Sequence, residues 1–250
     1  MSFGDFPSLR DRIGIAVHAL VPAAGGGARF GGDRPKQFRD LAGRPMLCWT
    51  IERLIAGGVD SVTVALPAEV AANPPAWLAE LRRVNLVAGG GTRQASVVLA
   101  LASLAAPSAE LILVHDGARP ALAGDDLRPV AAAAAAPGVD VAVLGRPLTD
   151  TLKRIDGDRI VTTVERAQFF RAETPQVFRR QTLERAFESA AAARFVGTDE
   201  SSVVERLPGA RVVAVEARHE NPKVTTPADV ARVEALLQGS ADPDRIREWR

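Results

Sequence analysis

The sequence predicts an α/β fold: a mostly parallel sheet with helices on both faces and a β-arm that protrudes from it. The prediction depends on two observations, the apolar runs of β type that recur along the chain and the amphipathic segments between them. Apolar strands that alternate with helices are typical of parallel sheets buried on both faces and joined by right-handed crossovers. The predicted strands are residues 16–21, 61–66, 84–88, 111–116, 139–144 and 210–216. The predicted helices are residues 45–57, 75–83, 93–105, 125–136, 180–193 and 227–238.

One predicted helix has low sequence complexity, because residues 129–138 read "PVAAAAAAPG". Alanine is the strongest helix former, and the pair Pro137 and Gly138 is a stop signal. We therefore predict a helix here and not a linker. No break in composition and no internal repeat marks a second domain, so residues 1–250 are predicted to form one domain.

Residues 147–178 depart from the alternation of strands and helices. Two short β-type runs flank the polar turn "DGD", and a connection then leads to Gln176 and Phe178. A turn between two β-type runs is typical of a hairpin. We predict an excursion from the sheet, an arm whose exposed apolar residues need a partner surface.

The composition limits the classes of function. Lys and Arg number 31 and Asp and Glu 30, so the net charge of +1 provides no overall basic field for nucleic acid. Cys48 is the sole cysteine and is expected to be a small core residue, and the three scattered histidines argue against a structural zinc site. No signal peptide or membrane span is predicted, which makes the cytoplasm the default location. Any anion site must therefore be local.

The segment "VPAAGGGARFGGDRPKQF", Val21–Phe38, follows the first predicted strand directly. In open α/β sheets a glycine-rich turn at this point lets backbone N–H groups approach a phosphate or a base. The dinucleotide fingerprint fails because Phe30 occupies the place of its third glycine, and the Walker A pattern fails because the segment has no Gly-Lys pair. Arg29 and Lys36 would suit a phosphoryl centre that gains negative charge as a nucleophile arrives. The alternative is a flexible surface loop with solvated cations.

Two further segments are predicted near the same end of the sheet. "LILVHDGARP" ends a strand with Asp116, a carboxylate placed to hold Mg²⁺, which prefers oxygen ligands shared with substrate phosphates. A capping role for Asp116 in the turn is the alternative. "AGGGTRQAS", residues 88–96, is a second glycine-rich turn, with Arg93 and Ser96 in the first turns of the helix that follows. Its backbone could read a base edge, and a plain turn that starts a helix is the alternative.

The glycine-rich loop resembles the signature loop of nucleotidyltransferases with the sugar-nucleotide pyrophosphorylase type of fold. Five further segments, "VHDGARP", "DTLKR", "ETPQVF", "TDESSVVE" and "NPKVTTPADV", follow in the order found in the 2-C-methyl-D-erythritol 4-phosphate cytidylyltransferases of the non-mevalonate isoprenoid pathway. The chain resembles that family from about residue 19 to residue 236, which is nearly its whole length. One glycine-rich loop alone would be weak support, whereas six ordered segments are specific.

The resemblance implies a Rossmann-like sheet of the nucleotide-diphospho-sugar transferase type and a homodimer formed through the arm. It also implies transfer of a cytidylyl group from CTP to 2-C-methyl-D-erythritol 4-phosphate, with Mg²⁺ as the cofactor. The products would be 4-diphosphocytidyl-2-C-methyl-D-erythritol and pyrophosphate. Small molecules, and neither nucleic acid nor a membrane, are the expected partners.

By the same resemblance, Arg29 and Lys36 would be catalytic and Asp116 would hold the metal. The residues that would position the acceptor substrate, some of them across the dimer interface, are Arg166, Lys223, Arg119, Thr151 and Thr174. The residues that would bind the nucleotide are Ala23, Ala24, Gly25, Gly26, Gly27, Gly90, Ser96 and Gly117. Gly91 departs from relatives that carry an acidic residue there, which affects one hydrogen bond to the nucleotide and not the site.

Other residues have structural interpretations. Thr226 is predicted to cap the last helix ahead of Pro227, and Asp199 is predicted to cap a helix without a catalytic role. Taken without the resemblance, Arg166 has the character of a solvated surface charge.

Three alternative functions stay open. A ribitol-5-phosphate cytidylyltransferase would share the loop and much of the fold, and a purine- or uridine-specific sugar-nucleotide pyrophosphorylase would share the loop. A module that senses CTP without chemistry is the third. The joint presence of Arg29, Lys36, Asp116 and Lys223 argues against a sensor, because binding alone does not require every charge around the reacting phosphorus.

Overall fold

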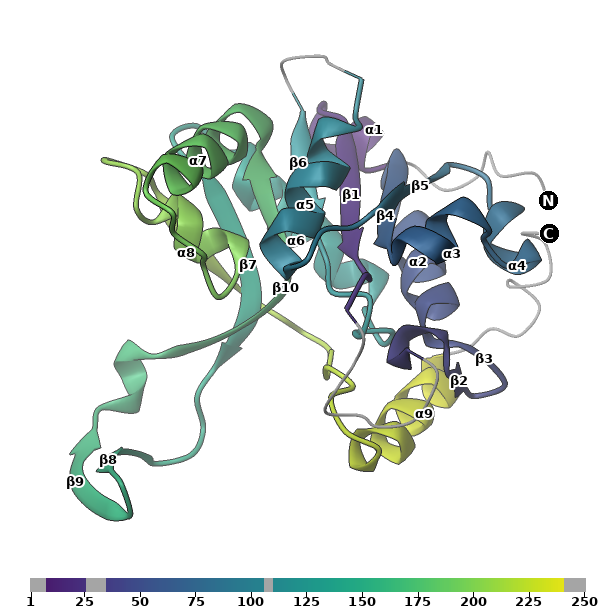
Figure 1. The fold of residues 1–250 in the computed structure, drawn as a ribbon. Coiled ribbons are helices and arrows are strands. Elements are labelled where there is room, and N and C mark those ends of the chain that lie inside the picture. The colour runs from purple at the N-terminus through teal and green to yellow at the C-terminus, as the bar shows by residue number, and fades with distance from the viewer. Residues whose placement is uncertain (1–7, 26–34, 106–109, 241–250) are drawn as a thin grey trace.

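A computed structural model describes residues 8–25, 35–105 and 110–240, and a seven-stranded sheet forms its centre (Figure 1). The strand order is β11-β7-β10-β6-β1-β4-β5. Neighbouring strands are parallel except at β10, which is antiparallel to both β6 and β7. The strands are β1 (Val17–Pro22), β4 (Ser61–Leu66), β5 (Val84–Ala88), β6 (Leu111–Val114), β7 (Val141–Pro147), β10 (Phe170–Arg179) and β11 (Val212–Glu216). The predicted class, a mostly parallel sheet with helices, is confirmed.

Helices lie on both sides of this sheet (Figure 1). On one face an apolar cluster joins the strands to α1 (Leu9–Ile13), α2 (Met46–Ala56) and α6 (Gly124–Ala135). On the other face a second cluster joins them to α5 (Arg93–Ala102), α7 (Arg180–Ala192) and α8 (Glu200–Val204). The remaining described elements are α3 (Ala68–Ala72), α4 (Ala76–Ala79), α9 (Ala228–Ser240), the 3-10 turns η1 (Lys36–Phe38) and η2 (Arg166–Gln168), and the short strands β2 (Asp40–Leu41), β3 (Arg44–Pro45), β8 (Leu152–Asp156) and β9 (Arg159–Val164).

The alternation of side chains along the strands explains the two clusters. Leu111 and Leu113 of β6 belong to the first cluster, whereas Ile112 and Val114 belong to the second. Successive side chains of a strand point to opposite faces, so a strand that is apolar throughout can serve both layers. The continuous apolar runs in the sequence therefore have their physical reason in a sheet covered on both sides.

One predicted helix has the wrong length. Residues 75–83 were expected to form a single helix, but α4 spans only Ala76–Ala79. Arg83, at the far end of the expected helix, has a φ of +63°, a left-handed conformation that no helix interior contains. Strands β4 and β5 coincide with the predicted residues 61–66 and 84–88.

Residues 147–178 were predicted to leave the sheet. This prediction is correct for the hairpin and wrong for the residues that follow it. The hairpin β8–β9 forms a separate two-stranded sheet that extends away from the main body (Figure 1). Residues 170–178, by contrast, belong to β10, the strand inserted between β6 and β7. Pro175 obscured this strand in the sequence, because proline is expected at strand edges or irregularities. The pairing of β10 with β7 has such an irregularity, a register shift between Ala172 and Gln176.

Because residues 170–178 belong to the sheet, the arm itself comprises residues 148–169 and carries the hairpin at its tip. Its apolar side chains are exposed, with 64% of Ile155 and 62% of Ile160 accessible. Phe169, at the base of the arm, is also exposed. Among the described helices of the chain, none is long and apolar enough to cross a membrane.

Candidate nucleotide-binding site

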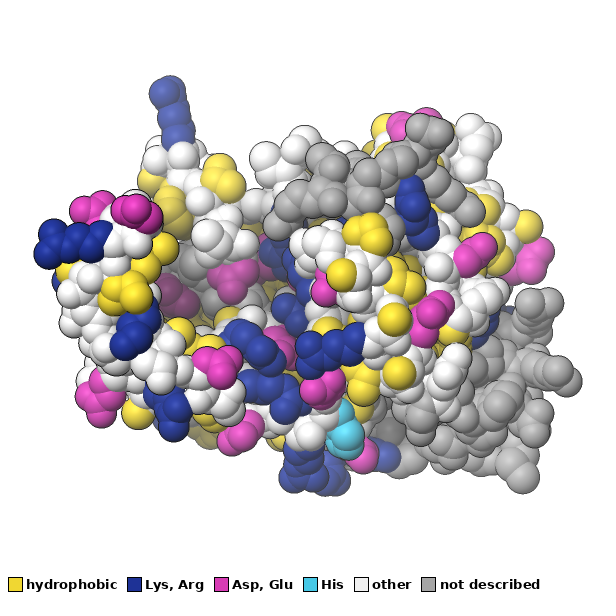
Figure 2. Space-filling view, turned by 90° about the horizontal axis from the view of Figure 1, so that it is seen from below, with side chains coloured by type: hydrophobic (Ala, Val, Ile, Leu, Met, Phe, Trp, Pro, Cys, Tyr) yellow, Lys and Arg dark blue, Asp and Glu magenta, His cyan; other side chains and the backbone are white. Residues whose placement is uncertain are grey.

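A cavity of about 480 Å³ opens at the carboxyl ends of the parallel strands β1, β5 and β6. This is the edge where ligands bind in open α/β sheets. Figure 2 looks onto this end of the sheet and shows Lys and Arg side chains gathered near its middle. The residues that line the cavity are Pro22, Ala23, Ala24, Gly25, Lys36, Gln37, Gly90, Gly91, Thr92, Arg93, Ser96, Asp116, Gly117, Ala118, Lys223 and Thr225.

The first glycine-rich segment forms one wall of the cavity. The backbone N–H of Ala23 donates to the carbonyl of Ala65 at 2.8 Å, and the buried side chain of Gln37 donates to the carbonyl of Ala23 at 2.6 Å. Lys36 lies beside Gln37, and its Nζ donates to the carbonyl of Val224 at 2.9 Å. Gly26, Gly27 and Arg29, predicted for this loop, lie outside the described residues.

The second glycine-rich turn forms the opposite wall. Ser96 Oγ accepts the backbone N–H of Gly90 at 3.1 Å and donates to the carbonyl of Thr92 at 2.9 Å, so the turn is fixed by one buried hydroxyl. The close approach of the two walls requires glycine at Gly89, because an added Cβ would overlap Ala24 and come within 2.9 Å of Ser96 Oγ. Gly91 has open space around it, so packing does not explain why an acidic side chain is missing there.

Asp116 is the centre of charge in the cavity. Its Oδ1 accepts from Arg93 Nε at 3.0 Å, its Oδ2 accepts from Lys223 Nζ at 2.8 Å, and Arg119 Nε lies 3.7 Å from Oδ2. Burial by itself would raise the pKa of Asp116, but Arg93 and Lys223 overcome it and hold this pKa well below its usual range. Asp116 is therefore ionised under all ordinary conditions and is compensated by cations.

The buried His115 supports Asp116 from behind. Its Nε2 lies 3.0 Å from the carbonyl of Arg119, which can only accept, so Nε2 carries the proton. Nδ1 then accepts from the hydroxyl of Thr174 at 3.0 Å, and the same hydroxyl accepts the backbone N–H of Asp116 at 3.1 Å. Burial lowers the pKa of His115 to about 4, which keeps the ring neutral at physiological pH. Thr174 thus supports the backbone of the site in this chain.

Arg119 lies next to the cavity wall in a cluster of charged residues. Its Nη1 donates to the carbonyl of Asn221 at 2.6 Å and lies 3.8 Å from Oε2 of the buried Glu173. Arg146 and Arg171 approach the other oxygen of Glu173, at 3.9 Å and 3.1 Å. One carboxylate therefore faces three guanidinium groups, which leaves this edge of the site with an excess of positive charge.

Thr151 and Arg166 are not brought to the cavity within the chain. Both lie on the arm and are exposed. The guanidinium of Arg166 donates to the carbonyl of Thr149, another residue of the arm. The structure therefore separates the predicted site residues into a group that lines or borders the cavity and a pair on the arm.

Two residues of the site received no role from the sequence. Arg93 Nη1 contacts both carboxylate oxygens of Glu200, at 2.6 and 2.5 Å, while its Nε binds Asp116. Burial raises the pKa of Glu200 and the charge of Arg93 opposes that rise. Arg93 was visible in the sequence as a residue of the second glycine-rich turn, but nothing local links it to a carboxylate 107 positions away.

The interpretations of the other singled-out residues are mostly confirmed. Asp199 caps α8, because its carboxylate accepts the backbone N–H of Ser202 at 2.9 Å. Cys48 is buried, and burial raises the pKa of its thiol to about 12, so it is an inert core residue. At the last helix, Asp229 and not Thr226 accepts the free N–H groups: its Oδ2 bonds the backbone N–H of Thr225 and of Thr226.

The described residues contain no group of three or more His, Cys, Asp or Glu side chains that could hold a metal by themselves. Among the described residues that line the cavity, Asp116 is the one that carries a carboxylate. Such a site fits Mg²⁺, which usually takes one or two protein carboxylates and completes its shell with substrate phosphates and water. It does not fit a metal that needs an all-protein cage.

Comparison with known proteins gives one family throughout. Residues 17–239 match the family model of IspD, 2-C-methyl-D-erythritol 4-phosphate cytidylyltransferase. The chain is 40% identical over 245 residues to the 2-C-methyl-D-erythritol 4-phosphate cytidylyltransferase of Ralstonia nicotianae, which covers 94% of this chain and 96% of that relative. It is 43% identical over 227 residues to the enzyme of that name from Cereibacter sphaeroides, with 89% and 97% covered.

Solved structures agree with the sequence relatives. The crystal structure of 2-C-methyl-D-erythritol 4-phosphate cytidylyltransferase from Thermus thermophilus superposes with a TM-score of 0.75 at 34% identity and covers 90% of this chain and 100% of that chain. The enzyme from Francisella tularensis, at 26% identity, gives a TM-score of 0.76 over 89% of this chain and 100% of that chain. The seven-stranded sheet and its helices thus have a fold that is already known.

Proposed function

The chain belongs to the family of 2-C-methyl-D-erythritol 4-phosphate cytidylyltransferases, and we propose how its residues carry out the family reaction. That reaction transfers a cytidylyl group from CTP to 2-C-methyl-D-erythritol 4-phosphate in isoprenoid precursor biosynthesis. An oxygen of the acceptor phosphate attacks the α-phosphorus of CTP, the bond from that phosphorus to the β-phosphate oxygen breaks, and pyrophosphate leaves. The observation that carries the proposal is the convergence of Lys36, Asp116 and Lys223 on one cavity between two glycine-rich turns.

The donor nucleotide would occupy the cavity between the two turns. Ala23, Ala24 and Gly25 line the first wall, and because the N–H of Ala23 is bonded to Ala65, the N–H groups of Ala24 and Gly25 would face the phosphates. The second wall, where Ser96 already holds the N–H of Gly90, would offer its remaining backbone groups to the base. Cytosine needs both a donor and an acceptor, and a turn can present both. Gly26, Gly27 and Arg29 would extend the phosphate contacts, and Gly117 would offer its backbone to the nucleotide from the cavity lining.

The chemistry of the step is stabilisation of charge. No covalent enzyme intermediate is needed for an in-line attack, and the inert Cys48 agrees with that. Lys36 and Arg29 would stabilise the negative charge that grows on the oxygens of the α-phosphate. Lys223 would hold the attacking phosphate and Arg119 the acceptor beside it. Lys36, whose ammonium is already held by the carbonyl of Val224, can act in the transition state with little reorganisation.

Mg²⁺ would be held by Asp116 together with the phosphates of CTP. The metal would neutralise the triphosphate and make pyrophosphate a better leaving group. The sequence-based assignment of Asp116 agrees with its place in the cavity lining and with its ionised state.

A homodimer would complete the acceptor site. Thr151 and Arg166 lie on an arm that extends away from the cavity of its own chain, so they can serve the reaction only at the site of a second copy. The exposed apolar side chains at the tip support the same proposal, because they would be covered by that copy. The cytoplasmic location stays a prediction from the sequence.

Pyrophosphate release with Mg²⁺ tests the function. We expect release with CTP and 2-C-methyl-D-erythritol 4-phosphate, and little with D-ribitol 5-phosphate or with ATP, GTP or UTP. Preference for ribitol phosphate would keep the mechanism and change the acceptor. Binding of CTP without release of pyrophosphate in the presence of any of these acceptors would contradict the proposal and favour a sensor.

A further inference from the structure

Arg93 connects the cavity to the second helical layer of the protein. Its side chain binds two carboxylates at once: Nε donates to Asp116 Oδ1 at 3.0 Å, and Nη1 donates to Glu200 Oε1 and Oε2 at 2.6 and 2.5 Å. Only a forked guanidinium can make both sets of contacts from one position. The Arg93 side chain is 29% exposed and lines the cavity, whereas that of Glu200 is 1% exposed.

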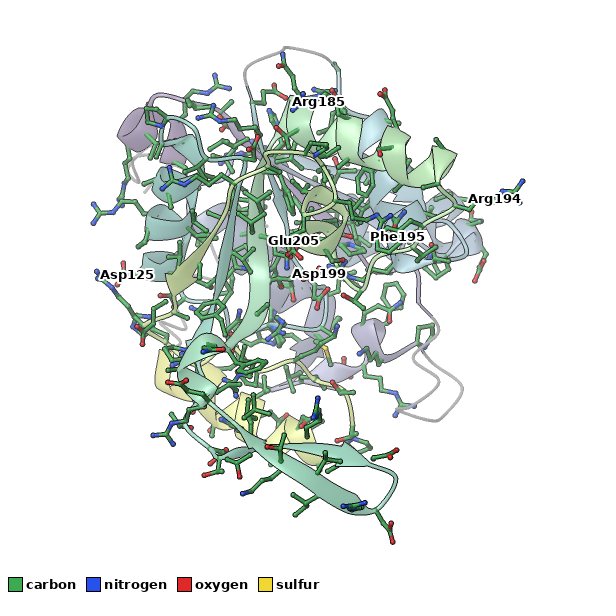
Figure 3. All side chains as sticks on the ribbon, turned by 90° about the vertical axis from the view of Figure 1, so that its left-hand side faces the viewer. Asp125, Arg185, Arg194, Phe195, Asp199 and Glu205 are labelled. Carbon is green, nitrogen blue, oxygen red and sulfur yellow. The ribbon has the colours of Figure 1, made fainter. Side chains whose placement is uncertain are left out.

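Glu200 is itself held in place by the central sheet. It is the first residue of α8. The helix cap Asp199, which is labelled in Figure 3, directly precedes it in the chain. Gln176 of β10 donates to Asp199 Oδ2 at 2.6 Å and accepts the backbone N–H of Ser201 at 3.1 Å. Gln176 therefore bonds the residues on both sides of Glu200. These bonds fix the backbone from which the Glu200 carboxylate reaches Arg93.

The two oxygens of Asp116 differ in how firmly they are bound. Oδ1 is bound by Arg93, which Glu200 anchors. The hydrogen bond to Oδ2 comes from the ammonium of Lys223, whose side chain is 37% exposed, and Arg119 Nε lies farther from Oδ2, at 3.7 Å. An anchored guanidinium keeps its place when a ligand arrives, and a lysine on a flexible stem can move to another anion. Oδ2 is thus the oxygen that can exchange its partner.

We propose that Arg93, anchored by Glu200, is a positioning residue for the reaction: it fixes Asp116 through Oδ1, so that Oδ2 can pass from Lys223 to the metal–nucleotide complex and Lys223 can turn to the substrate phosphates. Arg93 acts through Asp116 and does not itself touch the reacting atoms. The inference rests on the proposed role of Asp116. It assigns a function to two side chains, Arg93 and Glu200, that the sequence left without one.

The test measures CTP binding by calorimetry without acceptor, at increasing Mg²⁺, together with kcat and KM in the full reaction. Arg93→Lys keeps the charge and loses the fork, and Glu200→Gln keeps the shape and loses the anchor. We expect the Mg²⁺ concentration for half-maximal tightening of CTP binding to rise roughly 10- to 100-fold in both variants, with kcat reduced more than the KM for CTP is raised. The two changes combined should cost little more than either alone, because they break one connection.

Arg180→Lys is the matched control. Arg180 also bridges two carboxylates, Glu110 at 3.1 Å and Glu184 at 2.8 Å, but it lies at the start of α7, at the opposite end of the strands. The Arg180→Lys variant should be less stable than the wild type, while the Mg²⁺ dependence of its CTP binding stays unchanged. If the Arg93→Lys and Glu200→Gln variants have a lower melting temperature but keep the wild-type Mg²⁺ dependence and kcat, the inference about Arg93 is wrong and the proposed function stands. A wild-type protein whose CTP binding ignores Mg²⁺ would overturn the proposed metal role of Asp116 as well.

Discussion

The cavity end of the sheet and the arm hold their charged residues in different ways. At the cavity, Asp116 is bonded to Arg93 and Lys223, and Arg93 is bonded in turn to a buried glutamate. On the arm, Arg166 is exposed and contacts a backbone carbonyl of the arm itself. The cavity is organised within one chain, whereas the arm extends away from the main body of its own chain (Figure 1).

This difference separates two parts of the proposed reaction. Recognition of the nucleotide needs fixed donors, and a network built on the sheet provides them before the ligand arrives. Recognition of the acceptor would depend on assembly, because in the proposed dimer the arm would reach the cavity of the second copy. Changes at the cavity should therefore alter the chemistry in every protomer, and changes on the arm should alter what its partner can do.

The largest expected effect is at the cavity. Lys36→Ala should reduce turnover by roughly 10² to 10³, because it removes a fixed cation from the phosphoryl centre. Pyrophosphate release at saturating substrates measures it. Lys153→Ala is the matched control on the arm, where Lys153 only bonds the hydroxyl of Thr163 at 2.7 Å. Near-wild-type turnover in the Lys36 variant would refute the role given to that residue.

The arm allows a sharper experiment. Arg166→Ala should reduce turnover by about 10²-fold, as for loss of one charge-assisted contact to the reacting phosphate, while CTP binding stays unchanged. If the site combines Lys36 of one chain with Arg166 of the other, a mixed dimer of the two inactive variants has one intact site. Equal mixing and re-equilibration should then restore about a quarter of the wild-type activity.

The outcome of mixing distinguishes the two arrangements. No recovery, in a mixture shown by mass spectrometry to contain mixed dimers, would mean that Arg166 serves its own chain or has no role. A stable monomer in solution would contradict the shared site directly.

The sequence predicted the residues of the cavity better than the residues that support them. The reason is the separation along the chain between residues that contact each other. Lys36 follows a glycine-rich loop and Asp116 ends a strand, so a short segment indicates each of them, whereas Lys223 was assigned through the family resemblance of its segment. Glu200 has no such pattern, because its partner Arg93 lies 107 positions earlier and the two meet only when α5 and α8 pack on the same face. Strand β10 was missed for a related reason: Pro175 argues against a strand locally, while the neighbours on both sides that stabilise it are distant in sequence.

The buried His115, which supports the backbone of Asp116, should give a smaller effect, a pH dependence of the protein's stability. His115 has a pKa lowered by burial to about 4, whereas an unfolded histidine titrates near 6.5. Between these values the unfolded chain binds the proton more readily, so stability falls as the pH falls through that window and is unaffected above it. The loss should approach about 3 kcal/mol by pH 4. Urea unfolding at several pH values measures this loss. In the His115→Gln variant the free energy of unfolding should depend less on pH, and an equally steep pH dependence in that variant would contradict this explanation.

The apolar side chains at the tip of the hairpin should give the smallest effect, and one confined to assembly. Ile160→Ser removes an exposed apolar side chain, 62% accessible, from the tip of the hairpin, so it should leave the fold of the protomer intact. If a second copy covers that side chain, the lost apolar burial should weaken the dimer by roughly 10-fold in its dissociation constant. Sedimentation equilibrium measures the change, and Val196→Ser, with 64% exposure in the segment after α7, is the control. Because the acceptor site would form only in the dimer, the turnover of the Ile160 variant should rise with protein concentration toward the wild-type value. A loss of turnover that persists at high concentration would mean that the hairpin tip acts on the substrate and not on assembly.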